Sequence, residues 1–343
     1  MFEPFDTIWH MNNKSGIATF EEIWSEIKKA YNPIFIEKLL EIPNAHTYAF
    51  GGIVSDLSLG KPWKDLDIRV ILDMPQAERD QLVIDVLDQY TTIVQKFEFP
   101  EGTVVRVKVA GGKDMIIDVG IANSFEKFRS DFTACSIFVD LKTGDIAEIG
   151  NACVEDFRNK VIKPLDEPVA QLEADPSHLF RALKFAAKSG FVIDPQFEEI
   201  LKEKKSLVQK AVNNVTSYLA QNGKDSISEY FLGNIFGGLK AHPDEYVDLL
   251  EQYGFLEEMG KALQEVVEEK GKIIQFDKNN GELFKGLIVW EDKLSLFLSI
   301  IAKAISNDPA VCFEKLKKAF AFDTNRSDGN EFVVYPTKVI FKG

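Results

Sequence analysis

Cysteine is scarce in this sequence, in which Cys135, Cys153 and Cys312 are the only three among 343 residues. An odd number of cysteines without paired spacing indicates neither a disulfide framework nor a zinc site, so a reducing cytoplasm is the expected location. No stretch approaches roughly eighteen consecutive apolar residues, and we therefore expect no transmembrane helix and no membrane partner. The first residues, Met1–Asp6, lack the basic and apolar segments of a signal peptide.

Basic charge is also in short supply. The formal net charge is −14, and only 7 of the 40 basic residues are arginine. An acidic surface repels phosphate backbones, so a nucleic-acid partner would have to bind a local basic stripe. Two lysine clusters are candidates, although a solvated helix face is the commoner meaning of such clusters. They are Lys202, Lys204, Lys205 and Lys210, and Lys315, Lys317 and Lys318.

The chain divides near residue 170 into two parts of different periodicity. Before that point, strand-like runs at 104–110 and 137–141 and a helix-like run at 76–90 indicate an α+β fold with a mixed sheet. From Pro176 onward the apolar period is helical, which predicts an all-α array. Its predicted helices are 176–189, 195–221, 226–240, 244–270, 292–306 and 309–320.

A Gly-Gly pair, Gly51–Gly52, is predicted to form a strand-to-helix turn. The run 46–50 has the pattern of a buried strand, and 53–59 has the apolar spacing of a short helix. Glycine allows a sharp turn and a close approach to a ligand, and the free N–H groups at a helix start favour phosphate.

Two carboxylates follow this turn on a predicted strand at 65–72. The period of two places Asp65 and Asp67 on one face of the strand and Leu66, Ile68 and Val70 on the other. Two like charges on one face repel unless a cation lies between them. Hard oxygen ligands suit Mg²⁺, which is commonly held by one or two carboxylates and the phosphates of its substrate.

A third carboxylate, Asp118, lies in a second apolar strand at 115–121. Three carboxylates can hold two metal ions that activate an attacking hydroxyl and stabilise a leaving pyrophosphate. We therefore expect Asp65, Asp67 and Asp118 to be catalytic. Taken alone, each of these features is common on solvated strands, and it is their order and spacing that indicates a metal site.

Four segments in order resemble a known family. The first is Phe50-Gly51-Gly52 with Asp65-x-Asp67, which is similar to the polymerase-beta nucleotidyltransferase superfamily. The other three narrow the resemblance to the class II tRNA nucleotidyltransferase (CCA-adding) and bacterial poly(A) polymerase family. They are Arg129-Ser130-Asp131-Phe132-Thr133, the segment 155–163, and Asp175-Pro176-Ser177-His178-Leu179-Phe180-Arg181 with its continuation to Asp194. The resemblance covers about residues 45–260.

The resemblance implies a fold and a set of roles. It implies a catalytic head at 1–165, a helical, nucleotide-facing neck at 166–240, and a helical body at 241–343 with a short tail. The implied cofactor is Mg²⁺, with Mn²⁺ as a substitute, at Asp65 and Asp67. The implied substrates are an NTP (ATP or CTP) and an RNA 3′ end, of tRNA or another structured RNA. The implied nucleotide-binding residues are Gly51, Gly52, Arg129, Asp175, His178, Arg181 and Lys184.

At five positions this chain has another residue where the family has arginine. The replacements are Ser55, Ser130, Lys163, His178 and Lys184. A charge-assisted hydrogen bond contributes on the order of 1.5 to 3 kcal/mol, so two uncompensated serines would weaken triphosphate binding about a hundredfold or more. Arg129, Lys61, Lys64 and Arg106 are the candidates for compensation. Whether this chain adds C and then A, as the family usually does, is therefore left open.

Two other functions remain open beside nucleotide addition to RNA. The chain could transfer a nucleotide to a protein or a small molecule, which would suit its acidity. It could also be a catalytically impaired homologue that binds nucleotide or RNA. Asp175 has a second reading as well, since an aspartate before Pro176 is a favourable helix cap without any ligand. The base added, the oligomeric state and the role of 322–343 are left open.

Overall fold

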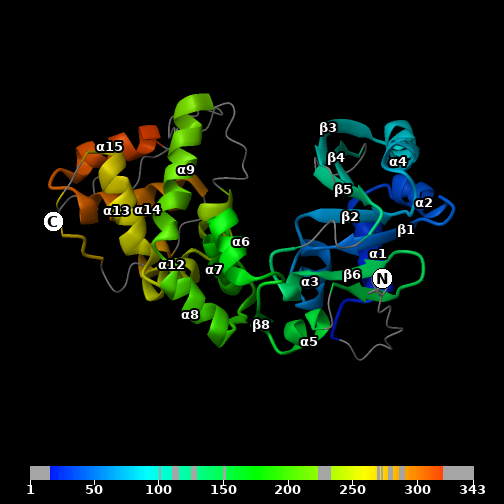
Figure 1. Cartoon of the computed structure of the whole chain (residues 1–343), viewed down its shortest axis with the longest axis horizontal. Coiled ribbons are helices and arrows are strands. Elements are labelled where there is room, and N and C mark those ends of the chain that lie inside the picture. Colours follow the sequence, from blue (N-terminus) through cyan, green and yellow to red (C-terminus); the bar gives the residue numbers. More distant parts are fainter. Residues whose placement is uncertain are drawn as a thin grey trace. The chain divides into compact units, whose positions relative to one another are not determined.

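The computed structural model describes residues 16–99, 102–109, 116–124, 130–149, 152–222, 233–268, 271, 273–276, 281–285 and 290–319. The chain forms two compact units, Met1–Leu165 and Asp166–Gly343 (Figure 1). The first unit holds a mixed sheet with helices. The described residues of the second unit are helical apart from loops and the two-residue strand β9, Val192–Ile193. The α+β class predicted from the sequence is confirmed. No helix in the described part of the chain is long and apolar enough to cross a membrane.

The first unit is built on a seven-stranded sheet of order β3-β4-β5-β2-β1-β6-β7. Strands β2 and β5 are parallel, and the other neighbouring pairs are antiparallel. The strands are β1 His46–Phe50, β2 Leu66–Ile71, β3 Thr92–Phe99, β4 Gly102–Lys108, β5 Ile116–Ala122, β6 Ile137–Asp140 and β7 Ile146–Glu148. The helical elements are α1 Phe20–Ala30, α2 Ile34–Leu40, α3 Gly52–Ser58, α4 Gln76–Tyr90, η2 Thr133–Cys135 and α5 Cys153–Arg158, and β8 is Val161–Ile162.

Strand β2 has the two faces that its alternating sequence predicts. Leu66, Ile68 and Val70 are buried, whereas Asp67 and Arg69 are half-buried. Helix α4 contacts β3, β4 and β5 and buries Val83 and Leu87 (Figure 1). Burying a Val or Leu side chain contributes roughly 1.5 to 3 kcal/mol. One face of β2 thus lies in the core, and the other carries Asp67 and Arg69.

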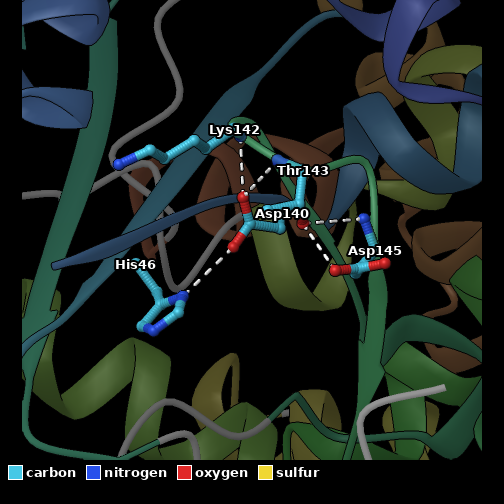
Figure 2. Close-up of polar contacts among 5 residues, drawn as sticks. All are labelled: His46, Asp140, Lys142, Thr143 and Asp145. Atoms are coloured by element: carbon cyan, nitrogen blue, oxygen red, sulfur yellow. Dashed lines mark hydrogen bonds and ion pairs between the residues drawn. The ribbon is translucent and has the colours of Figure 1, made fainter. Parts of the chain in front are cut away.

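The turn between β6 and β7 is organised by the buried carboxylate of Asp140. Its Oδ1 accepts hydrogen bonds from the backbone N–H of Lys142 at 2.7 Å and of Thr143 at 3.0 Å (Figure 2). Its Oδ2 lies 3.3 Å from Nδ1 of His46 on β1. The carboxylate therefore supplies acceptors for turn amides that the sheet leaves unpaired, and it connects the turn to the adjacent strand.

Replacing Asp140 should destabilise the first unit. We expect Asp140→Ala to lower the free energy of unfolding by about 2 to 3 kcal/mol, because it removes the acceptor from two turn amides. Lys142→Ala is the matched control, since only the backbone of Lys142 reaches Asp140, and it should change stability by about 0.5 kcal/mol or less. Urea denaturation of both variants measures the difference, and equal midpoints would contradict this role.

The second unit is an array of short helices. They are α6 Pro168–Ala174, α7 His178–Ser189, α8 Pro195–Glu203, α9 Leu207–Asn222, α11 Gly238–Ala241, α12 Pro243–Gln252, α13 Phe255–Val266, η4 Gly281–Phe284, α14 Trp290–Ile305 and α15 Pro309–Ala319. The largest fully buried side chains of this unit include Phe180, Phe236, Tyr246, Phe255 and Phe297. Edge-to-face contacts join Phe180 to Phe255 and Phe236 to Phe297.

Two predicted helices are wrong in length. The segment 195–221 forms α8 and α9 with a turn between them, because the backbone leaves helical geometry at Lys204. The segment 244–270 forms α12 and α13, because Gly254 adopts a left-handed φ of 73° that ends one helix and precedes the next. In the predicted helix 226–240, residues 226–232 lie outside the described residues, and α11 begins at Gly238. Residues 322–343 also lie outside them.

Candidate functional site

A row of paired residues crosses the half-exposed face of the sheet in the first unit. Asp67 on β2 pairs with Phe50 on β1 and with Asp118 on β5. Asp118 in turn pairs with Arg106 on β4. Directly opposed residues project to the same face. The structure therefore brings Asp67 and Asp118, which are far apart in the sequence, onto adjacent strands.

The Gly51–Gly52 turn connects β1 to α3, as the sequence predicts, and lies against Asp67. Gly51 has φ +70°, and a Cβ atom there would come within 2.8 Å of Oδ2 of Asp67. A Cβ at Gly52 would come within 3.6 Å of the backbone oxygen of Asp65. The absence of a side chain at Gly51 is thus required by both the turn and the carboxylate beside it.

The two carboxylates of the Asp-x-Asp pair lie in different surroundings. Asp65 precedes β2 and is exposed, while Asp67 is half-buried within the strand. The pKa of Asp67 is raised to about 6, mainly by burial and also by the charges of Asp118 and Asp65, against the lowering effect of Arg69 and Arg106. Within the described part of the chain, no residue donates a hydrogen bond to either carboxylate.

These observations fit a divalent cation at Asp65 and Asp67. A desolvated carboxylate beside two others is an unfavourable arrangement that a hard cation relieves. Asp118 differs, because its carboxylate is engaged by Arg106, with Nε at 2.8 Å from Oδ1 and Nη2 at 2.9 Å from Oδ2. Among the described residues, no three His, Cys, Asp or Glu side chains are grouped so as to hold a metal ion.

The raised pKa of Asp67 predicts a pH-dependent stability. The folded state holds this proton more tightly than the unfolded chain, so the free energy of unfolding falls as the pH rises from 3.8 to about 6. In metal-free solution at about pH 7.5, Asp67→Asn should therefore be more stable than the wild type, by roughly 1 to 2 kcal/mol. The gain should disappear below about pH 4. Thermal melts with a chelator at both pH values measure it, and a less stable variant at pH 7.5 would be the contrary result.

The second and third motif segments contact each other in the first unit. Asp156, which is buried, accepts hydrogen bonds from Thr133 Oγ1 at 2.8 Å and from Lys163 Nζ at 2.8 Å. The backbone N–H of Thr133 also bonds the carbonyl of Lys163 at 3.0 Å. Lys163 thus has a partner within its own motif. Arg129 lies outside the described residues, and Ser130 is half-exposed.

Ser55, at a position where the family has arginine, is buried on α3. Its hydroxyl donates to the carbonyl of Gly52 at 3.4 Å, one turn back along the same helix. This is a local contact that a serine makes readily. The guanidinium expected from the family therefore has no replacement at this position.

Four predicted nucleotide-binding residues lie at the start of the second unit. Asp175 follows α6, and its Oδ1 accepts from the backbone N–H of Ser177 at 2.9 Å, which is the capping role that the sequence leaves open. Nδ1 of His178 lies 2.9 Å from the carbonyl of Asp175. His178, Arg181 and Lys184 occupy the half-exposed side of α7. Lys184 Nζ donates to the carbonyl of Gly233 at 3.1 Å.

Both lysine clusters contain ion pairs or backbone contacts. In the first cluster, Lys202 pairs with Glu198 and Lys204 with Glu173. In the second, Lys317 pairs with Glu314, and Lys315 donates to the carbonyl of Val267. These contacts favour the reading of both clusters as solvated helix faces.

One residue beside the site is absent from the sequence-based prediction. Arg69 lies two positions after Asp67 on the same face of β2, with its guanidinium 4.8 Å from the centre of the Phe50 ring. Its charge lowers the pKa of Asp67. The period of two in the strand was sufficient to place Arg69 beside Asp67. Arg106, in contrast, could be paired with Asp118 only once the register of β4 and β5 was known.

Known proteins resemble this chain in sequence over part of their length. No protein-family model matches it. It is 25% identical over 179 residues to the CCA-adding enzyme of Lactobacillus helveticus, covering 50% of this chain and 44% of that protein. It is 24% identical over 243 residues to the CCA-adding enzyme of Ligilactobacillus salivarius, covering 67% and 58%. It is 28% identical over 171 residues to that of Bacillus subtilis, covering 47% and 42%. The chain spans about half the length of these curated relatives.

Solved structures share the fold over most of the chain. The Thermotoga maritima CCA-adding enzyme complexed with tRNA has a TM-score of 0.58 at 17% identity and covers 90% of this chain and 71% of that one. A tRNA nucleotidyltransferase complexed with a primer tRNA and an incoming ATP analog has a TM-score of 0.55 at 18% identity, with coverages of 84% and 82%. At these identities the likeness establishes the fold.

Proposed function

We propose that this chain, a divergent relative of the CCA-adding enzymes that shares their fold, is a Mg²⁺-dependent nucleotidyltransferase. It would add nucleotides from an NTP to an RNA 3′ end and release pyrophosphate. The observation that carries the proposal is the approach of the Gly51 turn to the Asp67 carboxylate, with Asp65 and Asp118 nearby. A turn without side chains beside two carboxylates provides room for a triphosphate next to its metal ligands.

Each residue of the head has a role in this proposal. Asp65 and Asp67 would hold Mg²⁺, which when bound activates the attacking 3′-hydroxyl and offsets the charge of the leaving pyrophosphate. Gly51 leaves Asp67 accessible at the turn. Arg69, held over Phe50, favours the ionised form of Asp67, because its positive charge lowers the pKa of this carboxyl against the effect of burial. Asp118 is the third carboxylate and lies beside Asp67, on the parallel strand β5.

The second unit would supply nucleotide selection. Asp175 and Arg181 offer an acceptor and a donor group that together can bind the edge of a base, as side chains do in a nucleic-acid groove. His178 lacks the bidentate fork of the family's arginine at this position. We therefore propose that the chain discriminates between CTP and ATP less strictly than its relatives do. The capping bond of Asp175 uses Oδ1, whereas Oδ2 lies 3.9 Å from Nδ1 of His178, so a base bound by Asp175 would lie beside the imidazole.

The proposed RNA substrate is tRNA. The support is that the relatives are named CCA-adding enzymes and that two structural neighbours are complexes with tRNA. The acidity of the chain means that RNA binding must depend on shape and on local backbone contacts, which is how proteins generally recognise structured RNA.

The test is nucleotide addition under matched conditions. The protein is incubated with Mg²⁺ and each labelled NTP in turn, with a tRNA lacking its 3′ CCA and with bulk RNA. Extension of the tRNA by CTP and ATP, abolished in an Asp65→Ala/Asp67→Ala variant, is the expected result. Absence of extension on every RNA, by a folded wild-type protein that binds Mg²⁺, would reject the proposal and direct the search to protein or small-molecule acceptors.

A further inference from the structure

Arg106 and Asp118 form a bidentate ion pair at one end of the carboxylate row. The two parallel contacts, at 2.8 and 2.9 Å, use Nε and Nη2 of the guanidinium and both carboxylate oxygens. This fork geometry is the strongest form of contact between these two groups. The side chains are 36% and 30% exposed, so solvent screens the pair only in part. The pair therefore uses one acceptor site on each oxygen of Asp118 and holds a positive charge directly against this carboxylate, which opposes a cation there.

Strand pairing and an aromatic ring both position the guanidinium of Arg106. Arg106 lies on β4, a strand paired on both edges, between β3 and β5. Its Cζ is 5.5 Å from the centre of the Phe97 ring on β3. A cation–π contact of this kind contributes about 0.5 to 1 kcal/mol at exposed sites. The arginine is thus held toward Asp118 by backbone pairing and by the aromatic ring.

The other two carboxylates have no such partner. Neither Asp65 nor Asp67 accepts a hydrogen bond from any residue that the structure describes. Asp67 is the Cα partner of Asp118 on the parallel strand, so a carboxylate without a hydrogen-bond donor lies directly beside one that is engaged by an arginine. One Mg²⁺ is commonly held by one or two carboxylates, so Asp65 and Asp67 are sufficient for a single ion.

We propose that Arg106 is a positioning residue that keeps Asp118 from the metal ligands, so that the free head binds a single divalent cation. This rests on the proposed function only in taking Asp65 and Asp67 as the ligands. The positive charge of Arg106 also opposes a second cation at this end of the row. Without Arg106, Asp118 and Asp67 together form a second cation site.

Manganese binding tests this without any turnover. Mn²⁺ is titrated into metal-free protein, and bound ions are counted by electron paramagnetic resonance. The wild type should bind one Mn²⁺ per chain and Arg106→Gln two, with the second ion bound at least about tenfold more tightly than any second ion in the wild type. Arg158→Gln, which removes the same charge from an exposed position in the same unit, should still bind one. Arg106→Gln/Asp118→Asn should return to one, because the second site requires Asp118.

The outcomes separate this inference from the proposed function. If Asp67→Asn binds as much Mn²⁺ as the wild type, the metal site and the proposed chemistry fail together. If Asp67→Asn loses its ion but Arg106→Gln still binds one, only the role of Arg106 is overturned. The wild-type count decides by itself even if Arg106→Gln does not fold, because two tightly bound ions in the wild type contradict the inference.

Discussion

Asp67→Asn should reduce nucleotidyl transfer on the order of 10³-fold or more, which corresponds to about 4 kcal/mol of transition-state stabilisation. The substitution keeps the size and shape of the side chain beside Gly51 but removes the charge that would hold the metal ion. Asp65→Asn should have a similar effect. Both are measured as incorporation of labelled nucleotide into a tRNA lacking its 3′ CCA, under single-turnover conditions, so that product release does not mask the loss.

A matched control distinguishes loss of a metal ligand from loss of acidity in general. Asp73→Asn changes an exposed aspartate just after β2, and its rate should stay within about twofold of the wild type. Stability provides a second control, because Asp67→Asn is expected to melt at the same or a higher temperature at neutral pH. A variant that is well folded and fully active would remove Asp67 from the metal site.

The sequence could predict the features that depend on local periodicity. The period of two in β2 correctly placed Leu66, Ile68 and Val70 in the core and Asp67 on the opposite face. The turn at Gly51–Gly52 and the helix after it were also correct, because glycine and apolar spacing act over a few residues. The position of the Asp-x-Asp pair after the glycine turn could therefore be predicted from the sequence alone.

The contacts that shape the site depend on strand register, which the sequence does not show. Gly51 lies against Asp67 because β1 and β2 pair with Phe50 opposite Asp67. Arg106 engages Asp118 because the β4–β5 register places them opposite each other. A shift of one residue in either register would move these side chains to the other face. The contact of Gly51 with Asp67 and the ion pair of Arg106 with Asp118 could therefore be identified only from the tertiary structure.

The helix boundaries that were wrong have a related cause. A helical apolar period continues through Lys204–Ser206, so nothing local marks the turn between α8 and α9 there. Gly254 did give a local signal, since glycine commonly follows the end of a helix. The prediction of one helix at 244–270 followed the apolar helical period and disregarded this glycine.

Gly51→Ala should reduce nucleotidyl transfer about a hundredfold, because its Cβ would come within 2.8 Å of Oδ2 of Asp67 and displace the carboxylate. A displacement of about 1 Å at a catalytic group can cost on the order of 10²-fold in rate. Gly51 has φ 70° and ψ −131°, a backbone conformation that alanine rarely adopts, and the resulting strain of roughly 1 to 3 kcal/mol lowers stability as well.

Gly60→Ala separates the steric clash from the strain. Gly60 has φ +66°, close to the +70° of Gly51, but a Cβ there would meet no atom within 4 Å. Both variants should lose stability in urea denaturation because both glycines have a positive φ, and only Gly51→Ala should lose transfer activity. In an Asp67→Asn background, Gly51→Ala should cost little further activity, because the charge it displaces has already been removed. Equal activity losses in the two alanine variants would mean that backbone strain, and not contact with Asp67, makes glycine necessary at residue 51.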